Sequence, residues 1–122
     1  MSHRTACTAL SLGRIAFGSA FLIAPGPAAS NWIGADAESA GAQLLCRAVG
    51  ARDVVLAGGL LNAIRRAAPC RSWIVAGLLA DLTDAGATIA AGGGIPRSGR
   101  LATVAIAGGA AIAGVVLAGA AD

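Results

Sequence analysis

The sequence predicts an all-α protein: a four-helix transmembrane bundle that forms a single domain over residues 1–122. Two observations lead to this fold class. Hydrophobic residues make up 57% of the chain and charged residues only 12%, about half of the charged share of an ordinary soluble domain. The apolar residues also gather in four stretches of about 18 to 24 residues, and about 20 are enough for a helix to cross the hydrocarbon core of a bilayer.

The first two predicted helices cover residues 7–24 and 41–64. The first ends at Pro25-Gly26-Pro27, because proline lacks the N–H that would continue the helix and its ring clashes with the preceding turn. A polar connection over residues 28–40 follows. The second helix closes at Arg65-Arg66, shortly before Pro69.

The last two predicted helices cover residues 72–91 and 101–120. Ser72 is a suitable N-cap for the third helix, and Gly92-Gly93-Gly94 is a strong stop signal behind it. Arg100 opens the fourth helix, which has no charged residue over 102–121. A surface helix of a soluble protein has one polar face, so this segment disfavours a soluble, alanine-rich bundle.

A cleaved signal peptide is the alternative interpretation of the first stretch. His3 and Arg4 precede the apolar run, and the small residues Ala28-Ala29-Ser30 follow it. Arg14, however, stands in the middle of the run, and the apolar region of a signal peptide is normally uncharged. We therefore expect the first stretch to remain in the protein as a helix.

The arginines predict the orientation in the membrane. All nine basic residues are arginine, and the loops with more positive charge normally face the cytoplasm. Arg4 and the group Arg65, Arg66 and Arg71 fall on one side of a four-crossing chain, against Arg97 and Arg100 on the other. The prediction is a multi-pass protein of the cell membrane with both termini cytoplasmic. Trp32 and Trp73, at segment edges on opposite sides, are expected to anchor at the two interfaces.

The expected partners are the lipid bilayer and a lipophilic small molecule. The scattered arginines form no contiguous basic patch, so we expect no nucleic-acid partner. Cys7, Cys46 and Cys70 lack metal-ligand spacing, and His3, the only histidine, lies in a terminus expected to be mobile. The sequence therefore predicts no metal site and no cofactor.

Small residues repeat at every fourth position of the fourth predicted helix, at Ala110, Gly114 and Ala118. Such rows let membrane helices approach closely. We expect this row to pack inside the bundle, although it leaves a homo-oligomer open.

Six charged residues fall inside the apolar stretches, three of each sign. A charge in hydrocarbon costs about 2.5–3.5 kcal/mol on insertion scales, so such residues face inward and find partners. The set is neutral as a whole, which favours a closed network. Its members are Arg14 on the first predicted helix, Arg47, Arg52 and Asp53 on the second, and Asp81 and Asp84 on the third.

Depth matching predicts the pairs. Consecutive helices run antiparallel, so residues equidistant from a connection lie at one level. We expect Arg14 to pair with Asp53, and Arg52 or Arg47 to pair with Asp84 and Asp81. Neighbouring residues point about 100° apart on a helix, so Arg52 and Asp53 are expected to serve different partners.

Three functions are consistent with this network. The favoured one is a structural or accessory bundle in which the ion pairs fix the register of the helices. The alternative is a membrane-embedded enzyme that isomerises or cyclises a lipophilic, isoprenoid-like substrate by acid/base chemistry. Its catalytic candidates are Asp81, Asp84 and Asp53, with Asp81 first because the other two have more obvious arginine partners. The third is a subunit of a proton-coupled transporter. The sequence alone leaves open whether the protein is an enzyme.

Five short motifs follow one another along the chain: Leu12-Gly13-Arg14, Ala24-Pro25-Gly26, Trp32-x-Gly34, Arg47-x-x-Gly50-Ala51-Arg52-Asp53 and Ala80-Asp81-x-x-Asp84. Together they resemble the small four-helix membrane proteins of unknown function that are common in actinobacteria. The resemblance covers nearly the whole chain, and the last two motifs are its distinctive part. It implies the four-helix fold and no particular chemistry.

Overall fold

The computed structural model describes residues 2–120, and over this range the protein is all-helical, without strands. Four long helices lie close to the predicted ones, and a fifth, short α-helix is present in addition. The elements are α1 (His3–Ile23), α2 (Pro25–Ile33), the 3₁₀ turn η1 (Gly34–Glu38), α3 (Ala40–Arg65), α4 (Arg71–Ala91), the 3₁₀ turn η2 (Gly92–Gly94) and α5 (Arg97–Gly119).

The short helix α2 and the turn η1 occupy most of the polar connection expected over residues 28–40. Pro25 ends α1 but occupies the first position of α2, where a missing N–H costs nothing and the fixed φ suits a helix. Gly34 ends α2 with a positive φ of 70°. Between Pro25 and Gly34 the connection therefore forms the short helix α2.

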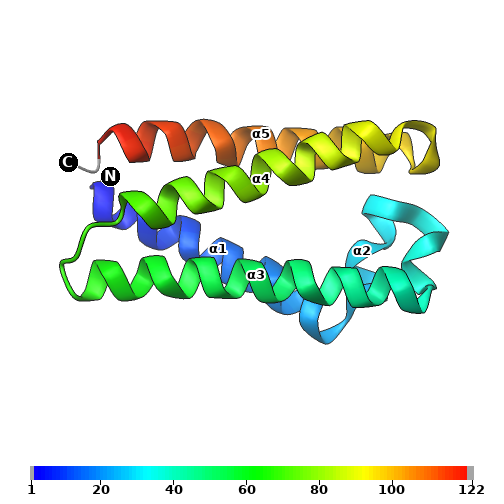
Figure 1. The fold of residues 1–122 in the computed structure, drawn as a ribbon, viewed down its shortest axis with the longest axis horizontal. Helices are drawn as coiled ribbons and strands as arrows, with labels where there is room; N and C mark the ends of the chain where they lie inside the picture. Colours follow the sequence, from blue (N-terminus) through cyan, green and yellow to red (C-terminus); the bar gives the residue numbers. More distant parts are fainter. Residues whose placement is uncertain (1, 121–122) are drawn as a thin grey trace.

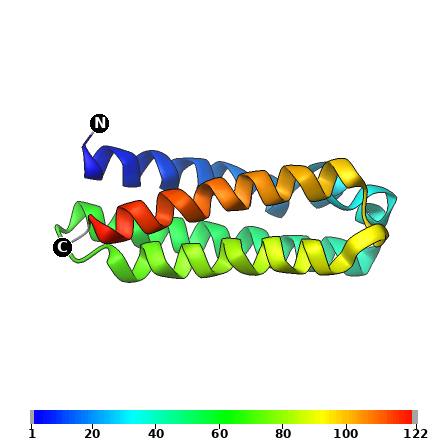
Figure 2. The same ribbon diagram turned by 90° about the horizontal axis from the view of Figure 1, so that it is seen from above.

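The long helices run antiparallel as two closely packed pairs (Figures 1 and 2). Helix α1 packs along α3, and α4 packs along α5, whereas the two pairs meet each other more loosely. Both termini and the α3–α4 connection lie at one end of the bundle, and α2 and η2 lie at the other (Figure 1). Helix α2 also reaches across to α5.

Local capping sets the helix ends. The Ser2 and Ser39 hydroxyls accept hydrogen bonds from Thr5 N and Ala42 N at the starts of α1 and α3, and Gly92 ends α4 with a positive φ of 54°, as predicted. Ser72 is not the N-cap of α4, because that helix already begins at Arg71.

The expectation of a mobile N-terminus at His3 is also wrong. His3 begins α1, and its Nε2 lies 3.0 Å from the carbonyl oxygen of Leu117 on α5. Arg4, one residue on, donates from Nη2 to the carbonyl oxygen of Ile64 at 2.7 Å and so caps the end of α3. These two contacts tie the start of α1 to both neighbouring helices.

Buried residues recur at seven-residue spacing along three helices, and this seam forms three layers. The end layers are two apolar clusters, one near the termini and one beneath α2. The middle layer is charged. From one end to the other the seam residues are Cys7, Arg14 and Phe21 on α1, Leu60, Asp53 and Cys46 on α3, and Ile74, Asp81 and Thr88 on α4.

The outer surface is apolar. Large hydrophobic side chains are exposed on all four long helices, among them Ile23, Leu44, Leu79 and Ile112. Three of these helices, α1, α4 with η2, and α5, are long and apolar enough to cross a membrane. Helix α3 is long enough but less apolar, because it also carries charged residues in its interior.

Helices α1 and α3 touch at glycine. A Cβ atom on Gly50 would lie 2.5 Å from the carbonyl oxygen of Gly18, and one on Gly18 would lie 2.6 Å from that of Gly50. Both distances are far below van der Waals contact, and both obstacles are backbone. The two helices therefore approach this closely only because neither residue has a side chain.

We predict that Gly50→Ala separates α1 from α3 and lowers the free energy of unfolding by about 1–3 kcal/mol, the usual cost of overpacking. Gly58→Ala on the same helix is the matched control, because nothing lies within 4 Å of its added Cβ. Because alanine has a higher helix propensity than glycine, Gly58→Ala should be up to about 1 kcal/mol more stable than the parent protein. Unfolding in mixed detergent measures both, and equal effects would contradict the close approach.

Candidate functional site

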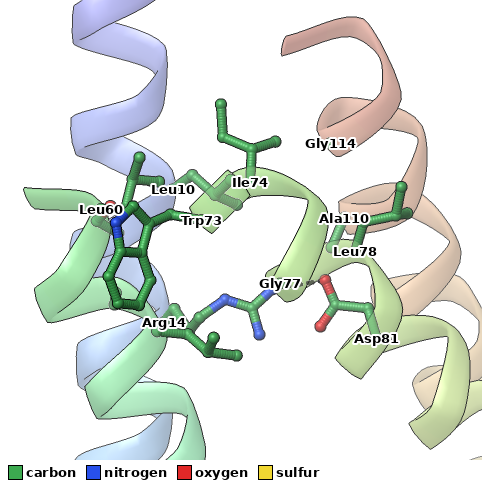
Figure 3. A pocket seen from close by; sticks show the side chains of 13 residues that line it. Leu10, Arg14, Leu60, Trp73, Ile74, Gly77, Leu78, Asp81, Ala110 and Gly114 are labelled. Carbon is green, nitrogen blue, oxygen red and sulfur yellow. Dashed lines mark hydrogen bonds and ion pairs between the residues drawn. The ribbon is translucent and has the colours of Figure 1, made fainter. Parts of the chain in front are cut away.

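Arg14 is the centre of the buried charged layer. Its Nη1 donates to Asp53 Oδ1 on α3 at 3.2 Å, and its Nη2 donates to Asp81 Oδ2 on α4 at 2.5 Å. In Figure 3 the guanidinium of Arg14 extends from α1 past Gly77 toward the Asp81 carboxylate. The Arg14 side chain is only 11% exposed. One guanidinium thus connects three helices.

Arg52 forms the second half of the layer. It holds Asp84 with two parallel hydrogen bonds, from Nη1 at 2.8 Å and from Nη2 at 2.6 Å, which is the strongest geometry for this pair of groups. The depth-matched contacts Arg14–Asp53 and Arg52–Asp84 are therefore both present.

One detail of the pairing differs from the sequence-based expectation. Arg52 also donates to its own neighbour, Asp53 Oδ1, from Nε at 3.2 Å and from Nη2 at 3.0 Å, because its long side chain folds back along α3. Asp81 pairs with Arg14, and among the described residues it accepts fewer hydrogen bonds than Asp53 or Asp84. The catalytic role expected for Asp81, Asp84 and Asp53 stays a prediction.

Arg47 lies outside the charged layer, contrary to expectation. Its side chain is exposed, and no ion pair among residues 2–120 joins it to the three aspartates. The reason is helical phase, since five residues separate Arg47 from Arg52 and rotate it by about 140° around α3. We therefore call Arg14, Arg52, Asp53, Asp81 and Asp84 the ion cluster.

The ion cluster has unequal charges: two guanidinium groups face three carboxylates. Both oxygens of Asp84 accept hydrogen bonds, but Asp53 accepts only at Oδ1 and Asp81 only at Oδ2. Asp53 Oδ2 and Asp81 Oδ1 have no donor among the described residues. The cluster is thus saturated on its Asp84 side and incomplete at two carboxylate oxygens.

A cavity of about 540 Å³ opens beside the ion cluster. Its walls come mainly from α1, α2 and α5, and its floor from Arg14 and the three aspartates of the cluster. Helices α1 and α5 make few contacts with each other, which leaves the space between them. The other residues around it are Ala9, Leu10, Gly13, Phe17, Phe21, Ala28, Asn31, Trp32, Gly99, Ala102, Thr103, Ile106, Ala107 and Ala110.

Aromatic side chains line one wall of this cavity. Phe17 and Phe21 have ring centroids 4.7 Å apart, and Trp32 meets Phe21 edge to face at 6.0 Å. Trp32 also donates from Nε1 to Thr88 Oγ1 on α4 at 3.1 Å. Its polar atom therefore points into the protein, and the expected position of Trp32 at the membrane interface stays a prediction.

A second, much smaller cavity of about 20 Å³ lies on the other side of Arg14 and Asp81 (Figure 3). It has room for one water-sized molecule. Leu60, Trp73 and Ile74 close it toward the termini. The ion pair between Arg14 and Asp81 lines both cavities.

Within residues 2–120, no group of three His, Cys, Asp or Glu side chains is arranged to hold a metal ion. No protein-family model, curated protein or solved structure matches this chain. The fold and the site thus define the class of protein by themselves. It is an all-helical protein with a buried ion cluster, an adjoining cavity and three helices long and apolar enough to cross a membrane.

Sequence reasoning missed the aromatic wall and the part that α2 plays in it. Phe17 and Phe21 share a face of α1 at four-residue spacing, which is a usable signal. Trp32 carries no such signal, because its position depends on the turn that α2 makes after Pro25. The cavity itself arises from the packing of whole helices and has no local pattern in the sequence.

We predict that Arg14→Met lowers the free energy of unfolding by about 3–5 kcal/mol, because it leaves two buried carboxylates without this partner. Arg47→Met is the matched control. Its side chain is exposed and outside the ion cluster, so the change should stay within about 0.5 kcal/mol. Unfolding in detergent, followed by circular dichroism, measures both variants. A similar cost for the two would contradict the central role of Arg14.

Proposed function

We propose that this chain is a small integral membrane protein that crosses the bilayer four times and binds a lipophilic molecule between its two helix pairs. The observation that carries the proposal is the cavity of about 540 Å³ beside the ion cluster. Its size is typical of small-molecule sites, which combine apolar walls with a few convergent polar groups. The ion cluster then acts as a brace, since its contacts join α1 and α3 to α4.

In this proposal α3 is the fourth membrane crossing, in addition to the three candidate spans. Arg52 and Asp53 are neutralised within the ion cluster, and Arg47 lies in the second turn of the helix. A long arginine side chain so near a helix end can extend to the lipid headgroups. The exposed Leu44, Leu45 and Val55 suit a lipid-facing surface. These features support α3 as a membrane crossing despite its charges.

The distribution of arginine supports the orientation with both termini in the cytoplasm. Arg4, Arg65, Arg66 and Arg71 lie at the end of the bundle that holds the termini, against Arg97 and Arg100 at the other (Figure 1). The positive-inside rule assigns the first end to the cytoplasm.

Two cysteine variants test this topology in a Cys70→Ser background, where the remaining Cys7 and Cys46 are buried. Ala68→Cys lies at the end with the termini, and Asp36→Cys lies at the opposite end. We expect a membrane-impermeant maleimide, applied to intact cells, to label only Asp36→Cys. Both should react once the membrane is opened. Labelling of both sites in intact cells would contradict four crossings in this orientation.

The ion cluster supports a structural role as well as a binding role, and the two are compatible. An enzyme that uses acid/base chemistry would need a carboxylate oxygen facing its substrate, and Asp81 Oδ1 is the best placed of these. A proton-coupled transporter finds less support, because α3, α4 and α5 run unbroken through their lengths and transporters of this kind usually bind their substrate at broken helices.

The motifs that resemble those of small actinobacterial membrane proteins include every residue of the ion cluster. Membership of that group is part of our proposal.

The binding proposal is tested by filling the cavity. Gly13 lines it, and nothing lies within 4 Å of a Cβ added there, so Gly13→Phe can occupy the space without displacing a neighbour. In a Trp73→Phe background, Trp32 in the cavity wall is the only tryptophan. We predict that anthracene, a neutral lipophile, accepts excitation energy from Trp32 in lipid nanodiscs, and that Gly13→Phe reduces this transfer to the level set by the lipid alone.

Gly58→Phe is the matched control, because its added Cβ also has open space but Gly58 lies on α3 away from the cavity. Energy transfer in this variant should equal that of the parent. If Gly13→Phe and Gly58→Phe give the same transfer as the parent, the cavity binds no lipophile and the proposal fails.

A further inference from the structure

We infer that the cavity selects lipophilic cations, such as an amine or an onium ion on an apolar body, over neutral and anionic lipophiles of the same size. This inference rests on the proposed function, because it names the class of ligand for the same cavity. Three separate features of the site carry it: the charge of the ion cluster, its two incomplete carboxylates and the aromatic wall.

The first feature is charge. Arg14 and Arg52 supply two positive charges, whereas Asp53, Asp81 and Asp84 supply three negative ones, so the cluster has an excess of one negative charge. A buried charge without a counter-charge is expensive in a low-dielectric interior. A monovalent cation in the adjoining cavity would balance the cluster, and an anion would double the imbalance.

The other cations nearby do not remove this excess. Arg47 is exposed on another face of α3. Arg97 and Arg100 are the positive residues of α5 and lie at its start, and no ion pair within the described chain connects either to an aspartate of the cluster. The remaining part of α5 along the cavity, Ala102 to Ala110, is uncharged.

The second feature is the placement of the free oxygens. Asp53 is 4% exposed and Asp81 is 8% exposed, yet each lines the cavity and each has one oxygen without a donor among residues 2–120. Neither oxygen is itself fully buried, because the only buried side-chain N or O atom without a partner among residues 2–120 is Arg100 Nε. A ligand with a positive centre, with or without an N–H donor, would complete both.

The third feature is the aromatic wall. Phe17, Phe21 and Trp32 are three of the four aromatic residues of the chain, and all three line this one cavity. The face of an aromatic ring attracts a cation, most strongly where water is excluded. Carboxylates on the floor and aromatic faces on the wall are together the two groups that recognise an onium ion.

The test uses two competitors of nearly the same size and shape but opposite charge, tetraphenylphosphonium and tetraphenylborate. Each is titrated against anthracene bound near Trp32 in the Trp73→Phe protein, in nanodiscs of zwitterionic lipid. The concentration of each competitor inside the discs is calculated from its partitioning into discs that contain no protein. We expect tetraphenylphosphonium to displace anthracene at a concentration at least about tenfold lower than tetraphenylborate, as an ion–ion contact of over 1.4 kcal/mol would give.

A variant that changes the charge near the cavity, at a residue outside the ion cluster, tests whether the excess negative charge causes the preference for tetraphenylphosphonium. Thr103 lines the cavity from α5, and Thr103→Arg adds a positive charge there without removing an existing ion pair. We expect this variant to lose the preference for tetraphenylphosphonium. Thr103→Met, which has a side chain of comparable bulk but no charge, should keep it. Asp81→Asn, which removes one negative charge from the cluster, should also lose the preference.

The outcomes separate this inference from the proposed function. If anthracene binds but the two competitors displace it equally, or the borate displaces it better, the cavity is a lipophile site without cation selectivity and the inference is overturned. If Thr103→Arg and Thr103→Met behave alike, the preference does not come from the charge of the cluster, and the inference also fails. If anthracene itself gives no transfer above the lipid background, the proposed function fails first.

Discussion

Every charge placed inside this bundle needs an opposite charge within hydrogen-bonding distance, and the arrangement of the helices follows from that constraint. Arg14 satisfies it for two carboxylates at once, on α3 and on α4. Arg52 satisfies it for Asp84 and supports Asp53. Because the pair α1/α3 meets the pair α4/α5 more loosely than the helices meet within each pair, these contacts are the principal polar connection between the two halves.

The interior and the surface reverse the pattern of a water-soluble protein. The large aliphatic side chains lie mostly outside, and the buried residues are rich in alanine, glycine, cysteine and charge. Gly18 and Gly50 bring α1 and α3 together, and small residues of α5 pack on α4. Close packing of backbones and a central polar layer lie between the two apolar clusters, an arrangement that suits a helical bundle in an apolar solvent.

The long helices and the two main ion pairs could be predicted from the sequence because both depend on simple periodic quantities. Apolar length and proline or glycine stops locate the helices, and equal distance from a connection places Arg14 beside Asp53 and Arg52 beside Asp84. Depth alone misplaces Arg47, because it ignores the direction in which a residue points around its helix. Helix α2 is not predicted, because Pro25 is equally consistent with the end of one helix and the beginning of another. The cavity could not be predicted, since it depends on how two helix pairs fit together.

The ion cluster bears on how the chain would enter a bilayer under the proposed four crossings. Helix α3 would then bring Arg52 and Asp53 into the hydrocarbon, and their partners lie on α1, which is synthesised earlier, and on α4, which is synthesised later. Helix α1 faces the same difficulty with Arg14, whose two partners both follow it. With four crossings, neither helix would leave the insertion machinery for lipid alone without exposing a charge, at a cost of about 2.5–3.5 kcal/mol on insertion scales. Insertion of the first three long helices as one unit, after Asp84 has emerged, would avoid that cost.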